Sequence, residues 1–167
     1  MASVLVAHAT KFGSTREVAE RVAARLRDHG LDVEESSARW VKTLDGHDAV
    51  VFGGALYMFR LIRPGRRFFA RHHGRLSRMP LAVFGMGPLE DKQEHFVDAR
   101  RHLDKTLAKY QQVSPVAVEI FGGVLNPEKL RFPYSNPGMK AMPPVDLRDW
   151  KVIDAWADSL PEKLGLK

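Results

Sequence analysis

Apolar residues along this chain follow two recurring patterns, short unbroken runs and longer stretches with helical spacing. Unbroken runs indicate strands that are covered on both faces, and helical spacing indicates amphipathic helices that pack on a sheet. The predicted strands lie at residues 4–7, 31–36, 49–53, 81–84 and 116–121. The predicted helices lie at residues 14–29, from residue 64 onward, at 92–110 and from residues 146–149 onward, with a short helix at 40–44.

Several residues mark the ends of these helices. Gly30 stands where the first helix stops, and Pro64 falls in the first turn of the second. Either Asp146 or Asp149 is placed to cap the last helix. These signals agree with the element boundaries that the apolar pattern predicts.

Strands and helices therefore alternate five times along the chain. This alternation predicts an α/β fold, with a doubly wound five-stranded parallel sheet and helices on both faces. No repeat or linker interrupts residues 1–167, so we expect a single domain. Residues 122–147 form a long, irregular connection that carries five prolines, namely Pro127, Pro133, Pro137, Pro143 and Pro144.

Composition narrows the class of protein. Of the 167 residues, 44% are apolar and 28% are charged, as in ordinary globular proteins. No apolar run approaches the roughly 20 residues that span a bilayer, and no secretion leader is visible, so a cytoplasmic location is expected. Cysteine is absent, which excludes disulfides, cysteine nucleophiles and thiolate metal sites. Any redox chemistry would need a cofactor.

The charge is unevenly distributed. The net charge is +6 and the isoelectric point is near 9.8, yet residues 49–89 contain no acidic residue. This segment carries seven arginines, namely Arg60, Arg63, Arg66, Arg67, Arg71, Arg75 and Arg78. Such a surface favours anionic partners, for example acidic proteins, carboxylate-bearing substrates or an anionic membrane surface to which the protein binds peripherally. The alternative is an ordinary solvated helix face, and no motif for specific nucleic-acid recognition is present.

The first loop, at residues 8–17, joins a buried strand to the start of a helix. Free backbone N–H groups and the positive end of the helix dipole make this position an anion site. Gly13 lets the backbone turn close to a ligand, and Thr10, Ser14 and Thr15 offer hydroxyl groups. The loop therefore predicts phosphate binding.

A plainer interpretation of the same loop is a helix cap. Ser14 or Thr15 would cap the helix, with Glu17 completing a capping box for Ser14. The two interpretations are compatible, because a phosphate can share the same donors. Neither a Walker lysine pattern nor GxGxxG is present, which removes the main support for nucleoside triphosphate or dinucleotide binding at this loop.

Four segments together resemble a known family. They are Thr10-Lys11-Phe12-Gly13-Ser14-Thr15, Asp48-Ala49-Val50-Val51-Phe52-Gly53-Gly54-Ala55-Leu56-Tyr57, Phe121-Gly122-Gly123-Val124-Leu125 and Asp149-Trp150. The first is similar to the FMN phosphate loop of flavodoxins. The set resembles the flavodoxin-domain branch that includes the menaquinone-dependent protoporphyrinogen IX dehydrogenases. This resemblance implies a flavodoxin-like sheet in the order 2-1-3-4-5 and FMN as the cofactor.

The resemblance also implies which residues would bind the cofactor. The phosphate would lie at Thr10, Lys11, Phe12, Gly13, Ser14 and Thr15. The flavin ring would lie between Ala55, Leu56, Tyr57 and Met58 on one side and Gly85, Met86, Gly87, Pro88, Leu89 and Asp91 on the other. Tyr57 or Phe59 would stack on the ring, unless these residues only pack under the next helix.

Two residues in the first loop depart from the family pattern. Phe12 stands where many flavodoxins have a hydroxyl residue, and Ala9 stands where the dehydrogenase branch often has serine. Phosphate binding would then depend more on backbone amides, Thr10, Ser14 and Thr15, with Lys11 supplying charge. The connection before the last helix is also shorter than in the quinone-dependent enzymes, which weakens the case for quinone and membrane coupling.

Three functions are compatible with these features. The first is an FMN oxidoreductase that resembles the protoporphyrinogen IX dehydrogenases or reduces quinones, with Arg60 and Arg63 receiving the propionates of a tetrapyrrole. The second is an electron-transfer carrier that serves a redox partner and has no substrate site; its flavin would be expected in acidic surroundings, whereas this chain places positive charge there. The third is an interaction module that has lost its flavin. No histidine spacing indicates a metal site.

Overall fold

Five parallel strands form the centre of the molecule in the computed structural model, which describes residues 1–132 and 135–166. They are β1 (Ser3–Ala9), β2 (Asp32–Ser37), β3 (Ala49–Tyr57), β5 (Leu81–Met86) and β6 (Ala117–Phe121). Their order in the sheet is β2-β1-β3-β5-β6, which confirms the predicted order 2-1-3-4-5, with β5 and β6 as the fourth and fifth parallel strands. A sixth strand, β4 (Arg60–Leu61), pairs antiparallel with the end of β3.

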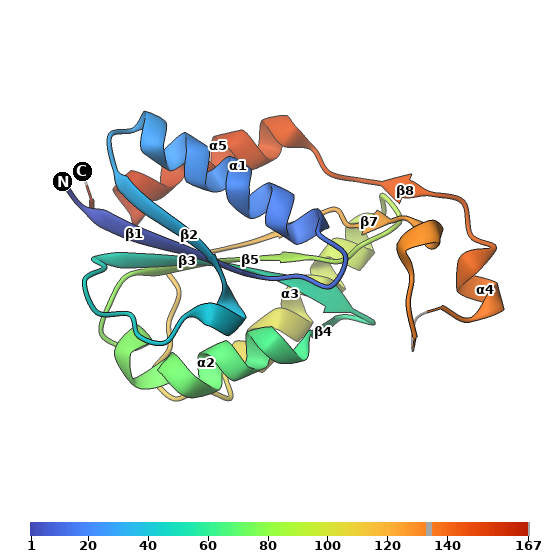
Figure 1. Cartoon of the computed structure of the whole chain (residues 1–167), viewed down its shortest axis with the longest axis horizontal. Helices are drawn as coiled ribbons and strands as arrows, with labels where there is room; N and C mark the ends of the chain where they lie inside the picture. Colours follow the sequence, from blue (N-terminus) through green and yellow to red (C-terminus); the bar gives the residue numbers. More distant parts are fainter. Residues whose placement is uncertain (133–134, 167) are drawn as a thin grey trace.

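Helices cover both faces of the sheet, as predicted. Figure 1 shows α1 (Ser14–Asp28) and α5 (Trp150–Lys163) on one face, and α2 (Arg63–Leu76) and α3 (Gln93–Leu107) on the other. Successive residues of β1 point alternately to the two layers: Leu5 and Ala7 pack beneath α2, whereas Val4 and Val6 pack beneath α1. The unbroken apolar runs of the sequence therefore reflect strands that are buried on both sides.

β3 is longer than the sequence suggests. The strand was expected to end at Gly53, but it continues to Tyr57, and Gly53 pairs with both His8 and Phe84. The glycine is required because a Cβ atom at position 53 would lie 2.0 Å from Cζ of Phe84. The segment expected to be a loop is thus a hairpin of β3 and β4, with its turn at Met58 and Phe59, whose φ angles are 51° and 64°.

The structure changes the predicted caps of the first and last helices and the predicted short helix at 40–44. Neither Ser14 nor Thr15 caps α1, because its N-cap is Gly13, in the left-handed conformation. Asp149 caps α5 by accepting hydrogen bonds from the backbone N–H groups of Lys151 and Val152, whereas Asp146 lies in a strand. The short helix expected at 40–44 is instead a 3₁₀ turn, η1 (Ala38–Trp40).

The connection at residues 122–147 contains more regular structure than its prolines suggest. Its elements are β7 (Val124–Leu125), η2 (Pro127–Lys129), α4 (Pro137–Lys140) and β8 (Val145–Asp146). β7 and β8 pair antiparallel, and Figure 1 shows α4 projecting beyond the carboxyl ends of the strands. Pro133, one of the predicted loop prolines, lies outside the described residues. None of the helices in residues 1–132 or 135–166 combines the length and apolar character needed to cross a bilayer.

Gly53→Ala should lower the free energy of unfolding by about 1–3 kcal/mol, because the added methyl group collides with the buried ring of Phe84. Gly74→Ala in α2 is the matched control. A Cβ there meets nothing within 4 Å, so this change should raise the stability by about 0.5–1 kcal/mol. Urea unfolding of the three proteins measures both effects. Equal stability of Gly53→Ala and the unchanged chain would contradict this account of β3.

Candidate functional site

The loop between β1 and α1 is shaped to receive an anion. Gly13 has a φ of 95°, and its N–H donates to Oγ1 of Thr10 at 2.9 Å, which fixes the turn. No side chain of the described residues caps the N-terminus of α1. Thr15 is fully buried, and its Oγ1 atom has no hydrogen-bond partner among the described residues. An uncapped helix N-terminus beside an unpaired buried hydroxyl is suited to a phosphate.

Arg148 stabilises this loop from the C-terminal segment, and sequence reasoning missed it. Its guanidinium binds Glu17 at 2.9 Å and Asp146 at 2.8 Å, and it also approaches the backbone oxygen of Ser14. Hydrogen bonding to Arg148 lowers the pKa of Asp146, so that carboxyl is ionised at neutral pH. Arg148 therefore shares its positive charge between Asp146 and Glu17, which lies in the first turn of α1. A single arginine beside a helix cap carries no sequence signal strong enough to select it.

Phe12 has a packing role in place of the missing hydroxyl. Its ring meets that of Tyr57 edge to face, with 6.0 Å between the centroids. This contact joins the first loop to the hairpin that follows β3. The loop that would hold a phosphate and the hairpin expected beside a flavin ring are therefore in contact.

The predicted hairpin residues lie in different environments. Ala55 and Leu56 are buried in the core, and their backbones pair with Met86 of β5 and Leu61 of β4. Met58 is 95% exposed at the tip of the turn. Phe59 stacks on His102 of α3, with 5.6 Å between the ring centroids, and Tyr57 remains half-buried beside the first loop. Of these residues, Tyr57 has the ring best placed to face a ligand at that loop.

The loop after β5 is fixed by backbone hydrogen bonds. Gly123 donates to the carbonyl of Pro88 at 2.7 Å, and Gly87 donates to the carbonyl of Phe121 at 3.4 Å. Gly85 and Met86 belong to the strand itself, and the side chain of Met86 is buried in the core beneath α5. The remaining predicted residues of this loop are Leu89, which lies beside Gly123, and the exposed Asp91.

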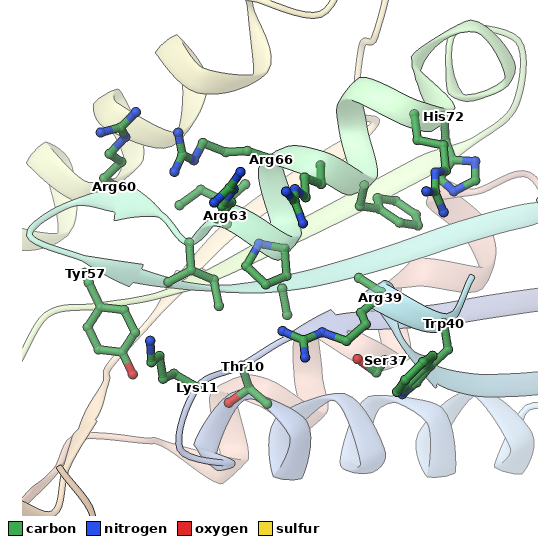
Figure 2. Close-up of a pocket in the computed structure, with 18 residues that line it drawn as sticks. Thr10, Lys11, Ser37, Arg39, Trp40, Tyr57, Arg60, Arg63, Arg66 and His72 are labelled. Atoms are coloured by element: carbon green, nitrogen blue, oxygen red, sulfur yellow. The ribbon is translucent and has the colours of Figure 1, made fainter. Parts of the chain in front are cut away.

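A cleft of about 1090 Å³ opens beside the first loop, between η1 and the start of α2. Five of the predicted site residues line it, namely Thr10, Lys11, Tyr57, Arg60 and Arg63. The loop after β5 and residues 12–15 do not line it. Figure 2 shows Arg39 reaching into the cleft from the side opposite Arg60 and Arg63. The predicted residues thus surround two adjoining spaces: a cradle at the start of α1 and an arginine-lined cleft.

Comparison with known proteins identifies the family of the chain. The family model described as "Flavodoxin domain" matches residues 5–134. The chain belongs to the flavodoxin domain family. Membership in this family indicates a flavin as the cofactor. Within the described residues, no group of three or more histidine or carboxylate side chains is positioned to hold a metal ion.

Related sequences and structures extend the comparison. The chain is 22% identical, over 130 residues, to proteins named protoporphyrinogen IX dehydrogenase [quinone] from Escherichia coli K12 and O157:H7, covering 77% of this chain and 72% of theirs. Its fold resembles that of a short-chain flavodoxin associated with a bacterial microcompartment, with a TM-score of 0.63 and 19% identity, covering 99% of this chain and 98% of that one. The flavodoxin of Streptococcus pneumoniae TIGR4 is similar, with a TM-score of 0.62, 20% identity and 99% coverage of both chains.

Among the described residues, two histidines are buried: His8 on β1 and His72 on α2. Burial lowers the pKa of His8, and the charge of Arg16 acts in the same direction, whereas Glu35 opposes the shift. Burial also lowers the pKa of His72, which lines the cleft, and the charge of Arg71 adds to the effect. Both side chains are therefore neutral in the folded protein at neutral pH.

Acid should destabilise the fold through these histidines. An unfolded histidine binds a proton below about pH 6.5. Because the folded state resists protonation, the free energy of unfolding should fall as the pH drops from about 6.5 toward the lowered values. His72→Leu should show a smaller fall between pH 7.5 and 5 than the unchanged chain, measured by urea unfolding. The exposed neighbour variant His73→Leu is the control, and a fall of equal size in all three proteins would refute this role of His72.

Proposed function

We propose that this protein is a flavin mononucleotide-dependent oxidoreductase that acts on an anionic substrate. The observation that carries the cofactor assignment is the buried, unpaired Oγ1 of Thr15 at the uncapped N-terminus of α1. A phosphate monoester would satisfy this hydroxyl and the free N–H groups of the first turn together. Family membership supports the flavin, since the cradle follows the first strand of a flavodoxin domain.

The residues present fit the phosphate and the ring of FMN. Thr10 orders the loop, Thr15 and the backbone of residues 13–16 would hold the phosphate, and Tyr57 and the loop at 87–91 would border the ring. When bound, FMN supplies a ring that accepts and returns hydride or electrons, which this cysteine-free chain cannot do with its own side chains. The protein's part is then to orient the two reactants and to set the charge around them.

Positive charge beside the expected ring site favours an enzyme over an electron carrier. Arg60 lies on β4 and Arg63 is the first residue of α2, so both stand at the edge of the arginine-lined cleft next to Tyr57. Both side chains are exposed, and each guanidinium offers a planar pair of donors that matches a carboxylate. The similar Escherichia coli proteins are named for a tetrapyrrole substrate and a quinone. We therefore propose that Arg60 and Arg63 receive the carboxylates of such a substrate.

Thr15→Val should separate cofactor binding from stability. Loss of the hydroxyl should weaken FMN binding by roughly tenfold to a hundredfold, because a hydrogen bond to a charged group contributes about 1.5–3 kcal/mol. Without FMN, the same change should leave the stability unchanged or raise it by about 1 kcal/mol, because it removes an unpaired buried hydroxyl. Fluorescence titration with FMN and thermal unfolding measure the two effects.

Thr106→Val is the matched control for this experiment. The hydroxyl of Thr106 donates to the backbone oxygen of His102 within α3, away from the first loop, so FMN affinity should not change. If Thr15→Val bound FMN as tightly as the unchanged chain, the phosphate would lie elsewhere. A chain that bound no FMN at all would favour the alternative of an interaction module that has lost its flavin.

Replacing both Arg60 and Arg63 with alanine should raise the KM for a carboxylated tetrapyrrole at least tenfold more than the KM for a neutral quinone. The reason is that each lost guanidinium removes a charge-assisted hydrogen bond to a carboxylate, which a quinone lacks. Steady-state kinetics of the FMN-loaded protein measure both constants. Equal effects on the two substrates would show that these arginines do not select the substrate. No turnover of either substrate by the unchanged chain would favour the electron carrier.

A further inference from the structure

The cleft beside the first loop has an unusual charge. Six arginines line it, namely Arg39, Arg60, Arg63, Arg66, Arg67 and Arg71. No aspartate or glutamate is among the described residues that line it. A concave surface with charges of one sign concentrates the electrostatic potential, so this cleft attracts ligands with several negative charges.

Several arginines outside the cleft have carboxylate partners. On the opposite face of the sheet, Arg21 binds Asp154 at 2.7 Å and Arg25 binds Asp158, which join α1 to α5. In the cleft, Arg63, Arg67 and Arg71 follow one another at intervals of four residues on α2, so like charges are neighbours on one helix face. Such spacing destabilises a helix. A bound polyanion would relieve this repulsion, whereas the ion pairs of α1 and α5 need no ligand.

The cleft also has an aromatic edge and an unpaired donor. Trp40, at the end of η1, is 73% exposed on the cleft wall, which is unusual for so large an apolar side chain. Figure 2 shows its indole beside Arg39, across the cleft from α2. Nε of Arg66 is buried without a hydrogen-bond partner among the described residues. The first turn of α2 has no side-chain cap in the described chain, so its backbone adds positive potential to the same space.

We propose that this cleft is a second ligand site, which binds a nucleotide carrying several phosphate groups. Guanidinium groups bind phosphates in pairs of parallel hydrogen bonds, and an exposed indole stacks on a heterocyclic base. Six guanidiniums exceed what a ligand with two carboxylates would need, so the charge favours a polyphosphate. The site adjoins the FMN cradle at Thr10, Lys11 and Tyr57, whereas residues 12–15 and the loop after β5 do not line it. The cleft includes Arg60 and Arg63, which the proposed function assigns to the carboxylates of the substrate, so a polyphosphate nucleotide and that substrate would compete for it.

A series of adenine compounds tests the site. Adenosine, AMP and ATP share one ring and differ in phosphate charge, and inorganic tripolyphosphate has the charge without the ring. In protein saturated with FMN, ATP should bind at least tenfold more tightly than AMP, and adenosine should bind most weakly. Tripolyphosphate should bind more weakly than ATP. Isothermal titration calorimetry at fixed low salt measures all four affinities, and the ATP stoichiometry should be one per chain.

Paired variants locate the binding. Arg67→Ala with Arg71→Ala should weaken ATP binding at least tenfold, because both exposed side chains line the cleft. Arg75→Ala with Arg78→Ala removes the same charge from exposed positions outside the cleft and should change the affinity less than twofold. Trp40→Ala should weaken ATP binding while leaving tripolyphosphate binding unchanged. Thr15→Val should leave ATP binding unchanged, which separates this site from the FMN cradle.

Three results would overturn the proposal. The first is equal binding of AMP and ATP, or no ATP binding at all. The second is an equal loss of affinity in the two double-arginine variants, which would indicate attraction by the net charge of the protein alone. The third is tight binding of coproporphyrin III, a tetracarboxylate macrocycle, to protein that does not bind ATP; the cleft would then be a carboxylate site. None of these results bears on whether FMN binds at Thr15.

Discussion

The close approach of β3 to its two neighbours is the constraint on which the rest of the structure depends. Gly53 pairs with His8 on one side and Phe84 on the other, and the ring of Phe84 occupies the space where a side chain at position 53 would lie. This packing keeps β1, β3 and β5 parallel as far as their carboxyl ends. The loops that follow these strands then meet at one edge of the sheet, where doubly wound folds bind their ligands.

The two faces of the sheet distribute charge differently at that edge. On the α1 and α5 face, Arg21 and Arg25 are paired with carboxylates, and Arg148 binds Glu17 beside the first loop. On the α2 face, the arginines that line the cleft have no carboxylate among the described cleft residues. Ion pairs therefore join α1 to α5 on one face of the sheet, and the positive charge without carboxylate partners is concentrated beside α2 on the other. The cradle at the start of α1 and the arginine-lined cleft therefore adjoin in surroundings of different charge.

The sequence predicted a parallel sheet with helices on both faces because two-sided burial leaves unbroken apolar runs, and these are visible without a structure. The order of the strands came from the resemblance to flavodoxins. The sequence failed at Gly53 and Gly54, because glycine is typical of strand ends, and only the structure shows that Phe84 and Leu61 occupy the space where side chains at these positions would lie. It did not choose between Asp146 and Asp149 as a cap, because both have the right chemistry and only backbone geometry selects Asp149. The first loop and the α2 arginines were predicted, but their joining with Arg39 and Trp40 was not, because tertiary packing alone creates it.

The cofactor is the central claim, and the protein as purified tests it most directly. The chain should be expressed and isolated without added flavin, its visible spectrum recorded, and any compound released on denaturation identified and counted. We expect a yellow protein that releases one FMN per chain, because the cradle at Thr15 has the donors that a phosphate monoester needs. A colourless protein that also fails to bind added FMN would contradict the account.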